Sequence, residues 1–541
     1  MTRSSSAVAA ALAAVLAAAC GGGGSKKSSG PSEGSTCTKQ SDCGSSLLCY
    51  AGKCAASLPA SPSCASPGGA PALLAGPAVT ASDPGVGVCG FSVQTPVFPA
   101  GAGLGQVQDL GTHTVGDVVT FTVPADTWSV TIYEQEVGGV APKTITISSG
   151  GGSSTLPNVA IPDQVKSPTG LVIFDDVGMS SPPTGTNGYD DYTRAFYGVH
   201  FGASTPYSGT ATFPNASKGL ELARVAGALV PGTWSLQVND YAYECATVYS
   251  NCTAGSSTTS KYRVHVVTHG PLRSTGKLDL DVYLATDNAN GTARLTAAQA
   301  VNDAGMKRLF ASAGTFLGRA GLCLGTVTFH DLPDWARSRF ALTSYDDTQA
   351  CDETNQLFRL ALTQDSGVHL FFVDELVDAN ATSSQVGTLL GLDGAIPGPS
   401  GLPGSPTSGA IVPIGGVTSG CAGSGLNLAT CEADLMAYVT SHEAGHWLGL
   451  FHTTEYPGTF FDPLSDTGEC PCNKCAVLKT GQTCGQDPSV AVTTSQCNKS
   501  SVCTGGDNLM FWLVTPGASS GNLTSQQGEV IRLNPAVEVS P

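Results

Sequence analysis

The sequence predicts a multidomain protein in which a β-sandwich accessory domain is followed by an α/β domain built from a mixed sheet and helices. Its 541 residues exceed the usual size of one domain several times over. Short alternating strands dominate the first half, whereas strands alternate with helical periods after about residue 275. The 19 cysteines are too many for a reducing compartment, so we expect an exported protein.

Charge and composition exclude two classes of protein. The chain carries 25 Lys and Arg against 42 Asp and Glu, a net charge of −17. Nucleic-acid-binding proteins need clustered basic residues to displace counterions from phosphates, so we expect no nucleic-acid partner. Hydrophobic residues make up 41% of the chain, which is enough for folded cores and excludes disorder along the whole length.

The first nineteen residues have the pattern of a signal peptide. Residues 7–19 form an apolar run of thirteen, too short to cross a bilayer. The run ends at Cys20 and resembles a bacterial lipoprotein cleavage site, where the cysteine becomes the lipidated N-terminus, although Leu16 stands one place earlier than usual. An ordinary signal peptide cut after Ala19 is the alternative. Residues 20–36 are rich in Gly and Ser and would form a flexible tether at the cell envelope or surface.

The cysteines beyond Cys20 number eighteen and fall into even clusters, which predicts disulfides whose connectivity the sequence leaves open. Residues 37–54 hold four of them and few apolar residues, so we expect a small module that depends on two bridges. Residues 55–96 are rich in Pro, Ser and Ala and would form a linker. The cluster within 470–475 would also suit a zinc or iron–sulfur site, but an exported chain favours disulfides.

The region 97–272 carries the pattern of the β-sandwich. Short β-branched stretches alternate in polarity, turns rich in Gly, Pro and Asn separate them, and no helical period interrupts them. Whether this domain binds a ligand, spaces the next domain or inhibits it stays open. The expected strands are 117–123, 128–133, 143–148, 171–174, 234–238 and 262–267.

The region 275–541 changes to an α/β pattern. Apolar residues from Met306 to Leu317 recur on one helical stripe, and residues 368–373 form a continuous apolar strand. Pro413 marks the last strand of the series as an edge strand or as a strand end. The remaining expected elements are strands at 278–285, 327–329 and 409–414 and a helix at about 354–362.

One motif in this region indicates a metal site. His442 and His446 are four residues apart, so on a helix their rings project from one face and can take two corners of a zinc tetrahedron. Glu443 lies beside them and can accept a proton from a water at the metal. Gly449 lets the helix turn sharply, and His452 then approaches the same metal from another direction. The alternative, three ordinary histidines at a helix end, does not account for this spacing.

The pattern HExxHxxGxxH resembles the metzincin clan of zinc endopeptidases. The clan also has a methionine turn beneath the metal, and Met510 is the only methionine after the motif. Within the clan the chain looks closest to the pappalysin family, through HEAGHWLGLFHTT at 442–454 and the stretches 462–467, 508–510 and 523–527. The resemblance covers roughly residues 275–535, half of the chain.

The resemblance implies a zinc-dependent endopeptidase with an upper subdomain to about residue 449 and a lower subdomain over 450–541. Zinc would polarise both a water and the scissile carbonyl, while Glu443 takes the water's proton and later protonates the leaving amine. Protein or peptide substrates would lie along an edge strand by β-augmentation. The candidate strand is 409–414, with Gly409, Ala410 and Ile411 as substrate-binding residues.

The resemblance also suggests a calcium site after the third histidine. Asp462, Ser465 and Thr467 occupy the matching positions and offer the oxygen ligands that calcium needs. A plain solvated loop is the alternative.

One departure from the family concerns substrate binding. Members usually place a tyrosine two residues after the turn methionine, where it donates a hydrogen bond to the tetrahedral intermediate. Here the position holds Trp512, whose indole N–H can donate but cannot ionise. A catalytically degenerate surface binding or scaffold lipoprotein is therefore the second hypothesis. If the protein is a zymogen, Cys64 and Cys89 are the candidates for a cysteine that blocks the zinc.

The lipid anchor gives the first testable prediction. Replacing Cys20 by Ser should release the protein from membranes or block its processing, because we expect the lipid to be its only membrane attachment. Membrane fractionation and the mass of the N-terminal peptide measure both outcomes. Normal processing together with retention in the membrane fraction would show that Cys20 carries no lipid.

Overall fold

The computed structural model describes most of the chain between residues 32 and 540. The predicted signal peptide with Cys20, and also Cys89, Cys245 and Cys252, lie outside the described residues. The described ranges are 32–88, 93–137, 143–147, 152–156, 159–160, 162–170, 172–174, 208–241, 260–288, 293–346, 351–362, 366–379, 389–417, 421, 423, 425–484 and 490–540.

The cysteine-rich module forms as predicted. A 3-10 turn, η1 (Gln40–Asp42), precedes the hairpin β1 (Leu48–Tyr50) and β2 (Lys53–Ala55). Two disulfides hold the module together, and its buried core consists of the four cysteines themselves. Their pairs are Cys37–Cys49 and Cys43–Cys54.

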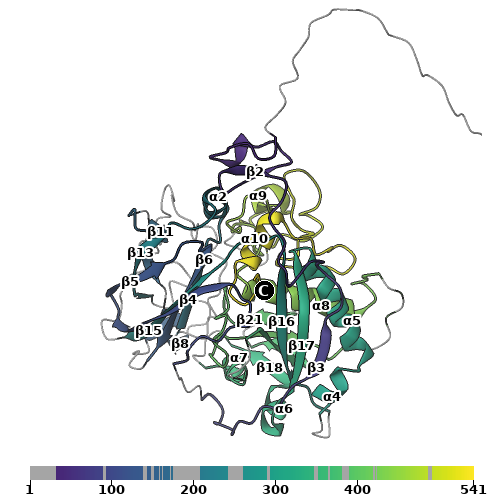
Figure 1. Cartoon of the computed structure of the whole chain (residues 1–541). Helices are drawn as coiled ribbons and strands as arrows, with labels where there is room; N and C mark the ends of the chain where they lie inside the picture. The colour runs from purple at the N-terminus through teal and green to yellow at the C-terminus, as the bar shows by residue number, and fades with distance from the viewer. Residues whose placement is uncertain are drawn as a thin grey trace, which may run out of the picture.

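Two antiparallel four-stranded sheets occupy the region of the expected sandwich (Figure 1). Each expected strand is present, and the structure adds strands that were not predicted, the longest of which is β4 (Leu104–Thr114). One sheet has the order β11 (Val172–Phe174), β10 (Asp163–Lys166), β13 (Gly232–Gln237), β5 (Val118–Val123). The other has the order β12 (Ser208–Phe213), β6 (Ser129–Glu136), β15 (Lys261–His269), β4. Two-stranded pairs join β7 (Lys143–Ile147) to β8 (Gly152–Leu156) and β14 (Asp240–Tyr241) to β9 (Val159–Ala160).

The two sheets share a core, and one helix lies beside them. Phe213 of β12 stacks on Trp234 of β13 with ring centroids 5.9 Å apart, which joins the sheets through aromatic side chains. Helix α2 (Ser217–Ala226) contradicts the expectation that no helix interrupts the strands. Its buried face contains Leu220 and Arg224, and a charged residue in the buried stripe hides the helical period from a hydrophobicity pattern.

The second half forms a mixed sheet, as predicted, and a strand from the first half brings this sheet to six strands. Five strands run parallel and β21, at one edge, runs antiparallel. The order is β21 (Leu392–Asp393), β22 (Ala410–Pro413), β19 (Val368–Val373), β16 (Gly276–Ala285), β17 (Leu322–Asp331) and β3 (Ala72–Ala75).

The strand β3 comes from the segment 55–96, which was expected to be a linker. Its residues 72–75 pair in parallel with 326–329 of β17, and Cys64 forms a disulfide with Cys323. The linker prediction is therefore wrong for this part of the segment. A four-residue strand between Pro-rich stretches carries too short a pattern to be recognised in sequence. The disulfide also removes Cys64 from the candidates for a zinc-blocking thiol.

Helices cover both faces of the six-stranded sheet. The core on one face contains α5 (Ala304–Gly318) and α8 (Glu432–Trp447), and the core on the other contains α6 (Asp334–Phe340) and α7 (Glu353–Phe358). Most of α8 is buried, because α5 and the sheet pack on one side and the C-terminal loops on the other. The smaller elements are α4 (Ala297–Ala300), β18 (Leu342–Tyr345), β20 (Glu375–Asp378), α9 (Cys472–Cys475) and α10 (Ser525–Arg532).

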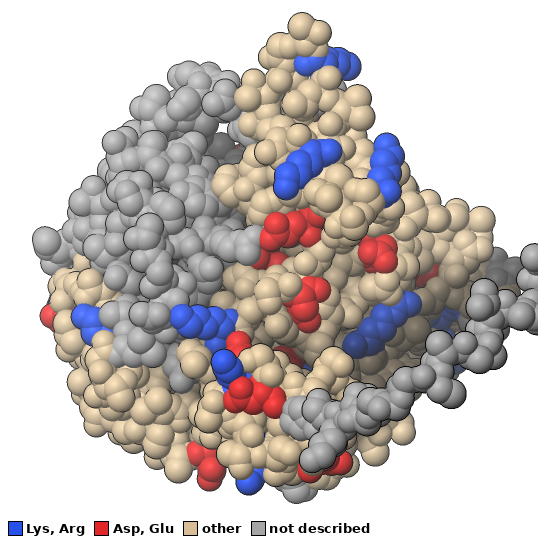
Figure 2. Space-filling view, turned by 90° about the horizontal axis from the view of Figure 1, so that it is seen from above, with Lys and Arg blue, Asp and Glu red and all other residues tan. Residues whose placement is uncertain are grey.

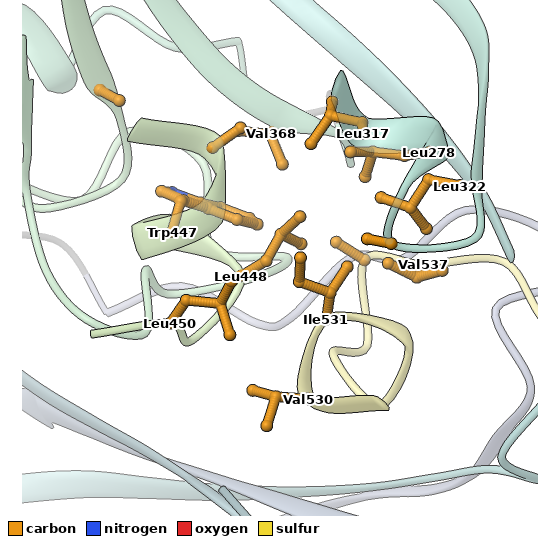
Figure 3. Packing of buried hydrophobic residues seen from close by; sticks show 14 of the residues in the cluster. Leu278, Leu317, Leu322, Val368, Trp447, Leu448, Leu450, Val530, Ile531 and Val537 are labelled. Carbon is orange, nitrogen blue, oxygen red and sulfur yellow. The ribbon is translucent and has the colours of Figure 1, made fainter. Parts of the chain in front are cut away.

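The end of α8 is fixed by apolar packing against α10. Figure 3 shows Trp447, Leu448 and Leu450 facing Val530 and Ile531. All five side chains are buried. This contact fixes the path of the chain after α8, which leads to His452, the third histidine of the motif. No helix in the described part of the chain is long and apolar enough to span a bilayer.

The two halves are joined by a continuous interface. One apolar core contains residues of both halves, and Tyr133 of β6 donates a hydrogen bond of 2.6 Å to the carbonyl of Ser400. Arg224 of α2 donates from Nη1 to both carboxylate oxygens of Glu529 in α10, each at 2.8 Å. Only 7% and 2% of these two side chains are exposed. Burial raises the pKa of Glu529, and the charges of Arg224 and Arg532 oppose that shift.

This ion pair gives the second prediction. Arg224→Met should lower the free energy of unfolding by about 3 kcal/mol, because Glu529 stays buried without its partner. Its pKa then rises further, so protonation at acidic pH relieves the cost and the deficit shrinks as pH falls. Urea unfolding at several pH values measures the effect. The double variant Arg224→Met, Glu529→Met is the control and should recover most of the loss, whereas an equal deficit at every pH would contradict the role of the carboxylate.

Candidate metal centre

Helix α8 brings the first two histidines of the motif together. His442 and His446 lie one turn apart on a buried helix, and their Nε2 atoms are 3.1 Å from each other. The Nδ1–H of His442 donates to the carbonyl of Leu509 at 2.6 Å, and that of His446 donates to the carbonyl of Leu450 at 2.7 Å. A carbonyl can only accept, so each neutral ring carries its proton on Nδ1 and directs a bare Nε2 lone pair at the other.

The third histidine reaches the same point from the loop after the helix. Gly449 has a left-handed φ of 106°, the conformation that was predicted to end the helix sharply. His452 then places its Nε2 3.1 Å from the Nε2 of each helical histidine. Its Nδ1 lies 2.9 Å from a carboxylate oxygen of Glu455. The sequence motif therefore identified all three converging rings.

The arrangement fits a metal ion. Three Nε2 atoms form an equilateral triangle with no proton donor between them, which is repulsive unless a cation binds there. Tetrahedral zinc with three imidazole ligands needs nitrogen separations of about 3.3 Å, close to those present. Burial, together with the neighbouring His452, lowers the pKa of His442 to about 3. Burial also holds the pKa of His446 well below its usual range, so both rings stay neutral as ligands.

A second cluster of metal-ligand types does not compete with this site. Cys37, Cys43 and Cys49 lie close enough together to hold an ion. All three are in disulfides, and a disulfide sulfur is not the thiolate that metals bind. Of the described residues, the histidines form the group of three available ligands.

The predicted base lies next to the histidines in a dry position. Burial raises the pKa of the Glu443 carboxyl to about 8. Gly391, just before β21, crosses directly over this carboxylate, and a Cβ at that position would collide with Oε1 of Glu443. Asp393 of β21 shares that side of the strand, and burial followed by the charge of Glu443 raises its pKa well above the ordinary value.

The methionine turn is in its expected place. Met510 is fully buried, and a Cβ on Gly445 of α8 would come within 2.6 Å of its sulfur. Its carbonyl accepts from the backbone N–H of Thr453 at 2.9 Å, and its own N–H donates to Asn508 Oδ1 at 2.8 Å. The turn therefore contacts both the helix that carries two histidines and the loop that carries the third.

The calcium candidates are only partly brought together. Thr467 Oγ1 donates to Asp462 Oδ1 at 2.6 Å, so these two side chains are in direct contact. Ser465 is exposed, and its backbone N–H donates to Ser217 Oγ of α2 at 2.6 Å. The loop thus docks against α2, and the calcium site stays a hypothesis.

The predicted substrate strand is not at the edge of the sheet. Residues 410 and 411 pair with β19 on one side and with β21 on the other, and Gly409, Ala410 and Ile411 are all buried. The assignment of these three residues to substrate binding is therefore wrong, because β21 covers the strand. Pro413 is a strand end, as its chemistry suggested. Among the described strands, β21 is the edge on this side, and it lies over Glu443.

Trp512, at the position where the resemblance led us to expect a tyrosine, makes its hydrogen bond away from the histidines. Trp512 is half-buried, and its indole N–H donates to the carbonyl of Val492 at 2.8 Å. It also meets the ring of Tyr456 edge to face. In this conformation its N–H is not directed at the histidines.

Sequence reasoning missed Glu455, Gly391 and Asp393. Glu455 could have been found from its position three residues after the third histidine, since carboxylates commonly accept a hydrogen bond from metal-ligating imidazoles. Gly391 and Asp393 lie next to and within a two-residue strand whose position over α8 depends on tertiary pairing alone.

Comparisons with known proteins do not identify the chain. No protein-family model matches it, and a search of curated proteins finds no significant match. The functional argument therefore rests on the geometry of the site and on the motif.

The hydrogen bond of Glu455 gives the third prediction. Glu455→Ala should weaken zinc affinity by about 10–100-fold, because His452 loses the group that fixes its tautomer and ring orientation. Glu455→Gln keeps an acceptor oxygen and should stay within a few-fold of the parent protein. Competition with a chromophoric chelator measures the affinities. Equal affinity in the alanine variant would show that Glu455 does not position the ring.

Proposed function

We propose that the protein is an extracytoplasmic zinc endopeptidase that hydrolyses peptide bonds of proteins. The observation that carries the proposal is the convergence of three Nε2 atoms at 3.1 Å beside the buried carboxylate of Glu443. Three protein ligands leave a fourth position open, which distinguishes a catalytic zinc site from a structural one. When bound, zinc supplies a Lewis acid that polarises a carbonyl and lowers the pKa of a water.

Glu443 supplies the proton transfer. Glu443 follows His442 in α8, but its carboxylate is not part of the group of possible metal ligands among the described residues. It can therefore act as a base and need not bind the metal. As the general base it accepts a proton from the attacking water at a carboxylate oxygen, and it then delivers a proton to the leaving amine. The glycine at 391 keeps space above this carboxylate, because any side chain there would displace it.

Strand β21 is the surface for the substrate backbone. It ends the six-stranded sheet among the described strands and lies over the base. An extended peptide that pairs with this edge by β-augmentation would pass Glu443 at the point where the chain holds Gly391. This assignment replaces the strand 410–413, whose two edges are already paired.

The proposal also includes the protease family. The motif, the buried Met510 and the mixed sheet support a metzincin of the pappalysin type, with the two packed sheets of the first half as its β-sandwich accessory domain. The many disulfides support an oxidising, extracellular environment, and Cys20 supports a lipid anchor. Calcium at Asp462 and Thr467 belongs to the same family expectation.

One observation favours a second function. The N–H of Trp512 is bonded to a backbone carbonyl, so the donor that family members use for the tetrahedral intermediate is missing in this conformation. A surface binding or scaffold protein with a degenerate protease domain would tolerate that loss. Such a protein would have no need for an intact base beside three intact ligands, which is why we rank it second.

The pair Glu443→Gln and His446→Ala gives the fourth prediction. Glu443→Gln keeps size and hydrogen-bonding capacity, so the variant should fold and retain zinc while peptide cleavage falls by about 10²–10⁴-fold. His446→Ala removes one of three protein ligands and should lose tightly bound zinc together with activity. Zinc analysis and cleavage of a denatured protein mixture, with and without chelator, measure both.

The two variants separate the chemistry from the site. Cleavage by purified Glu443→Gln at a rate close to the parent would remove Glu443 as the base. Full zinc occupancy in His446→Ala would remove the ligand assignment. Absence of chelator-sensitive cleavage in the parent protein, with zinc bound, would favour the scaffold function.

A further inference from the structure

The loop-rich region around α9 exposes an apolar cluster. Val477 is 76% exposed, Leu478 41% and Val502 50%. The disulfide Cys475–Cys503 brings the two segments together, with Cα atoms 5.7 Å apart. Each of the three apolar residues stands within three positions of that bond, so they occupy one small area. Exposed apolar side chains that gather in this way mark an interaction surface more often than scattered ones do.

Lysines surround the apolar cluster. Lys474, Lys479 and Lys499 are all exposed, and each lies within four residues of the same disulfide. Between residues 470 and 506 the described residues contain these three lysines and no Asp or Glu, and Glu469 and Asp507 flank the segment. Asp487 lies outside the described residues. The described charged residues nearest in sequence to the protruding apolar side chains are therefore basic.

Disulfides make this surface rigid. Cys472–Cys484 and Cys470–Cys497 anchor the same loops, and α9 spans only Cys472–Cys475. The buried core beneath consists largely of cysteines with Val490, Val492 and Phe511. A cross-linked loop region keeps its exposed valines and leucine outside because it has no larger core in which to bury them.

The surface lies at the end of the molecule from which the N-terminal module projects. Helix α2 contacts both the module and the loop 463–465, which precedes the α9 loops in the chain. The carbonyls of Arg224 and Val225 accept backbone hydrogen bonds from the module, and Ser217 is hydrogen-bonded to residues 463 and 465. The labels of β2, α2 and α9 stand together at the top of Figure 1, and Figure 2 looks down on this end, where blue basic and red acidic side chains are scattered over a largely uncharged surface.

The proposed anchor would bring this end to a membrane. Cys20 and the first described residue, Ser32, are twelve residues apart, which spans at most about 40 Å when extended. A lipid on Cys20 would therefore hold the module, α2 and the α9 loops near the bilayer. Lysines that flank exposed aliphatic side chains suit the interface of such a bilayer, where the charges meet anionic headgroups and the aliphatic groups enter the acyl boundary.

We propose that the surface formed by Lys474, Val477, Leu478, Lys479, Lys499 and Val502 docks on an anionic lipid bilayer. The surface acts in addition to the anchor and orients the protein on the membrane. It does not depend on the peptidase activity, because none of its residues belongs to the metal centre. Contact with a bilayer also accounts for basic charge concentrated in a strongly acidic chain.

Vesicle binding tests the proposal without the lipid anchor. The full chain carrying Cys20→Ser, purified after signal-peptide removal, is sedimented with vesicles of phosphatidylglycerol and phosphatidylcholine and with vesicles of phosphatidylcholine alone. We expect binding to the anionic vesicles that weakens with salt. Lys474→Ser with Lys479→Ser should weaken it on the order of 25-fold, about fivefold for each lysine. Val477→Ser with Leu478→Ser should also lower binding.

Matched variants elsewhere serve as controls. Lys307→Ser on α5 and Val118→Ser on β5 remove an exposed lysine and an exposed valine and should leave vesicle binding unchanged. Absence of binding, equal binding to neutral vesicles, or no effect of the surface variants would overturn the proposal, including in favour of a protein partner at this surface. Cleavage of a soluble peptide should be the same in all these variants, so a failure of the proposed peptidase function leaves the vesicle result intact.

Discussion

The orientation of three imidazole rings is the constraint on which the rest of the second half of the chain depends. Each ring must donate its Nδ1–H so that its Nε2 faces the others, and each acceptor comes from a different place: Leu509 in the methionine turn, Leu450 at the helix end and Glu455 in the following loop. Three features hold those acceptors in place: the buried contact of α8 with α10, the left-handed conformation of Gly449, and the packing of Met510 against Gly445. A metal site of this kind is thus a property of the surrounding fold as much as of its ligands.

The ligands could be predicted from sequence because their geometry is local. A spacing of four on a helix and a glycine that reverses the chain fix the relation of His442, His446 and His452 without knowledge of the rest. The large strands of both halves were likewise visible as periodic stretches. What sequence could not supply was pairing: β3 and β21 have four and two residues, and their places in the sheet come from hydrogen bonds to strands far away in the chain. Because the pairing of β21 could not be predicted, the edge strand was misassigned. Helix α2 was missed for another reason, since its buried stripe contains the charged Arg224.

The first half of the chain is attached to the second half at several independent points. Its helix α2 bonds to the loop after the third histidine and, through an ion pair, to α10, while Tyr133 reaches the segment that follows β21. Segments on both sides of the metal centre are therefore fixed by contacts with the two antiparallel sheets. A domain joined only by a flexible linker could not restrain these segments in this way, and β3 together with Cys64–Cys323 excludes such a linker between residues 55 and 96.

The loop-rich region after α8 is stabilised by disulfides and would be stabilised further by a metal ion at the histidines. Without a cation the three lone pairs repel one another, so an ion bound there would help to hold the loop that carries His452. The three disulfides among residues 470–503 act whether or not metal is bound, because they restrict the unfolded chain as well as the folded one. Phe511 packs on that cysteine core and is the neighbour of Met510, so the disulfide framework reaches directly to the turn beneath the histidines. The disulfides thereby keep the acceptor carbonyl of Leu509 in place independently of any metal at the histidines.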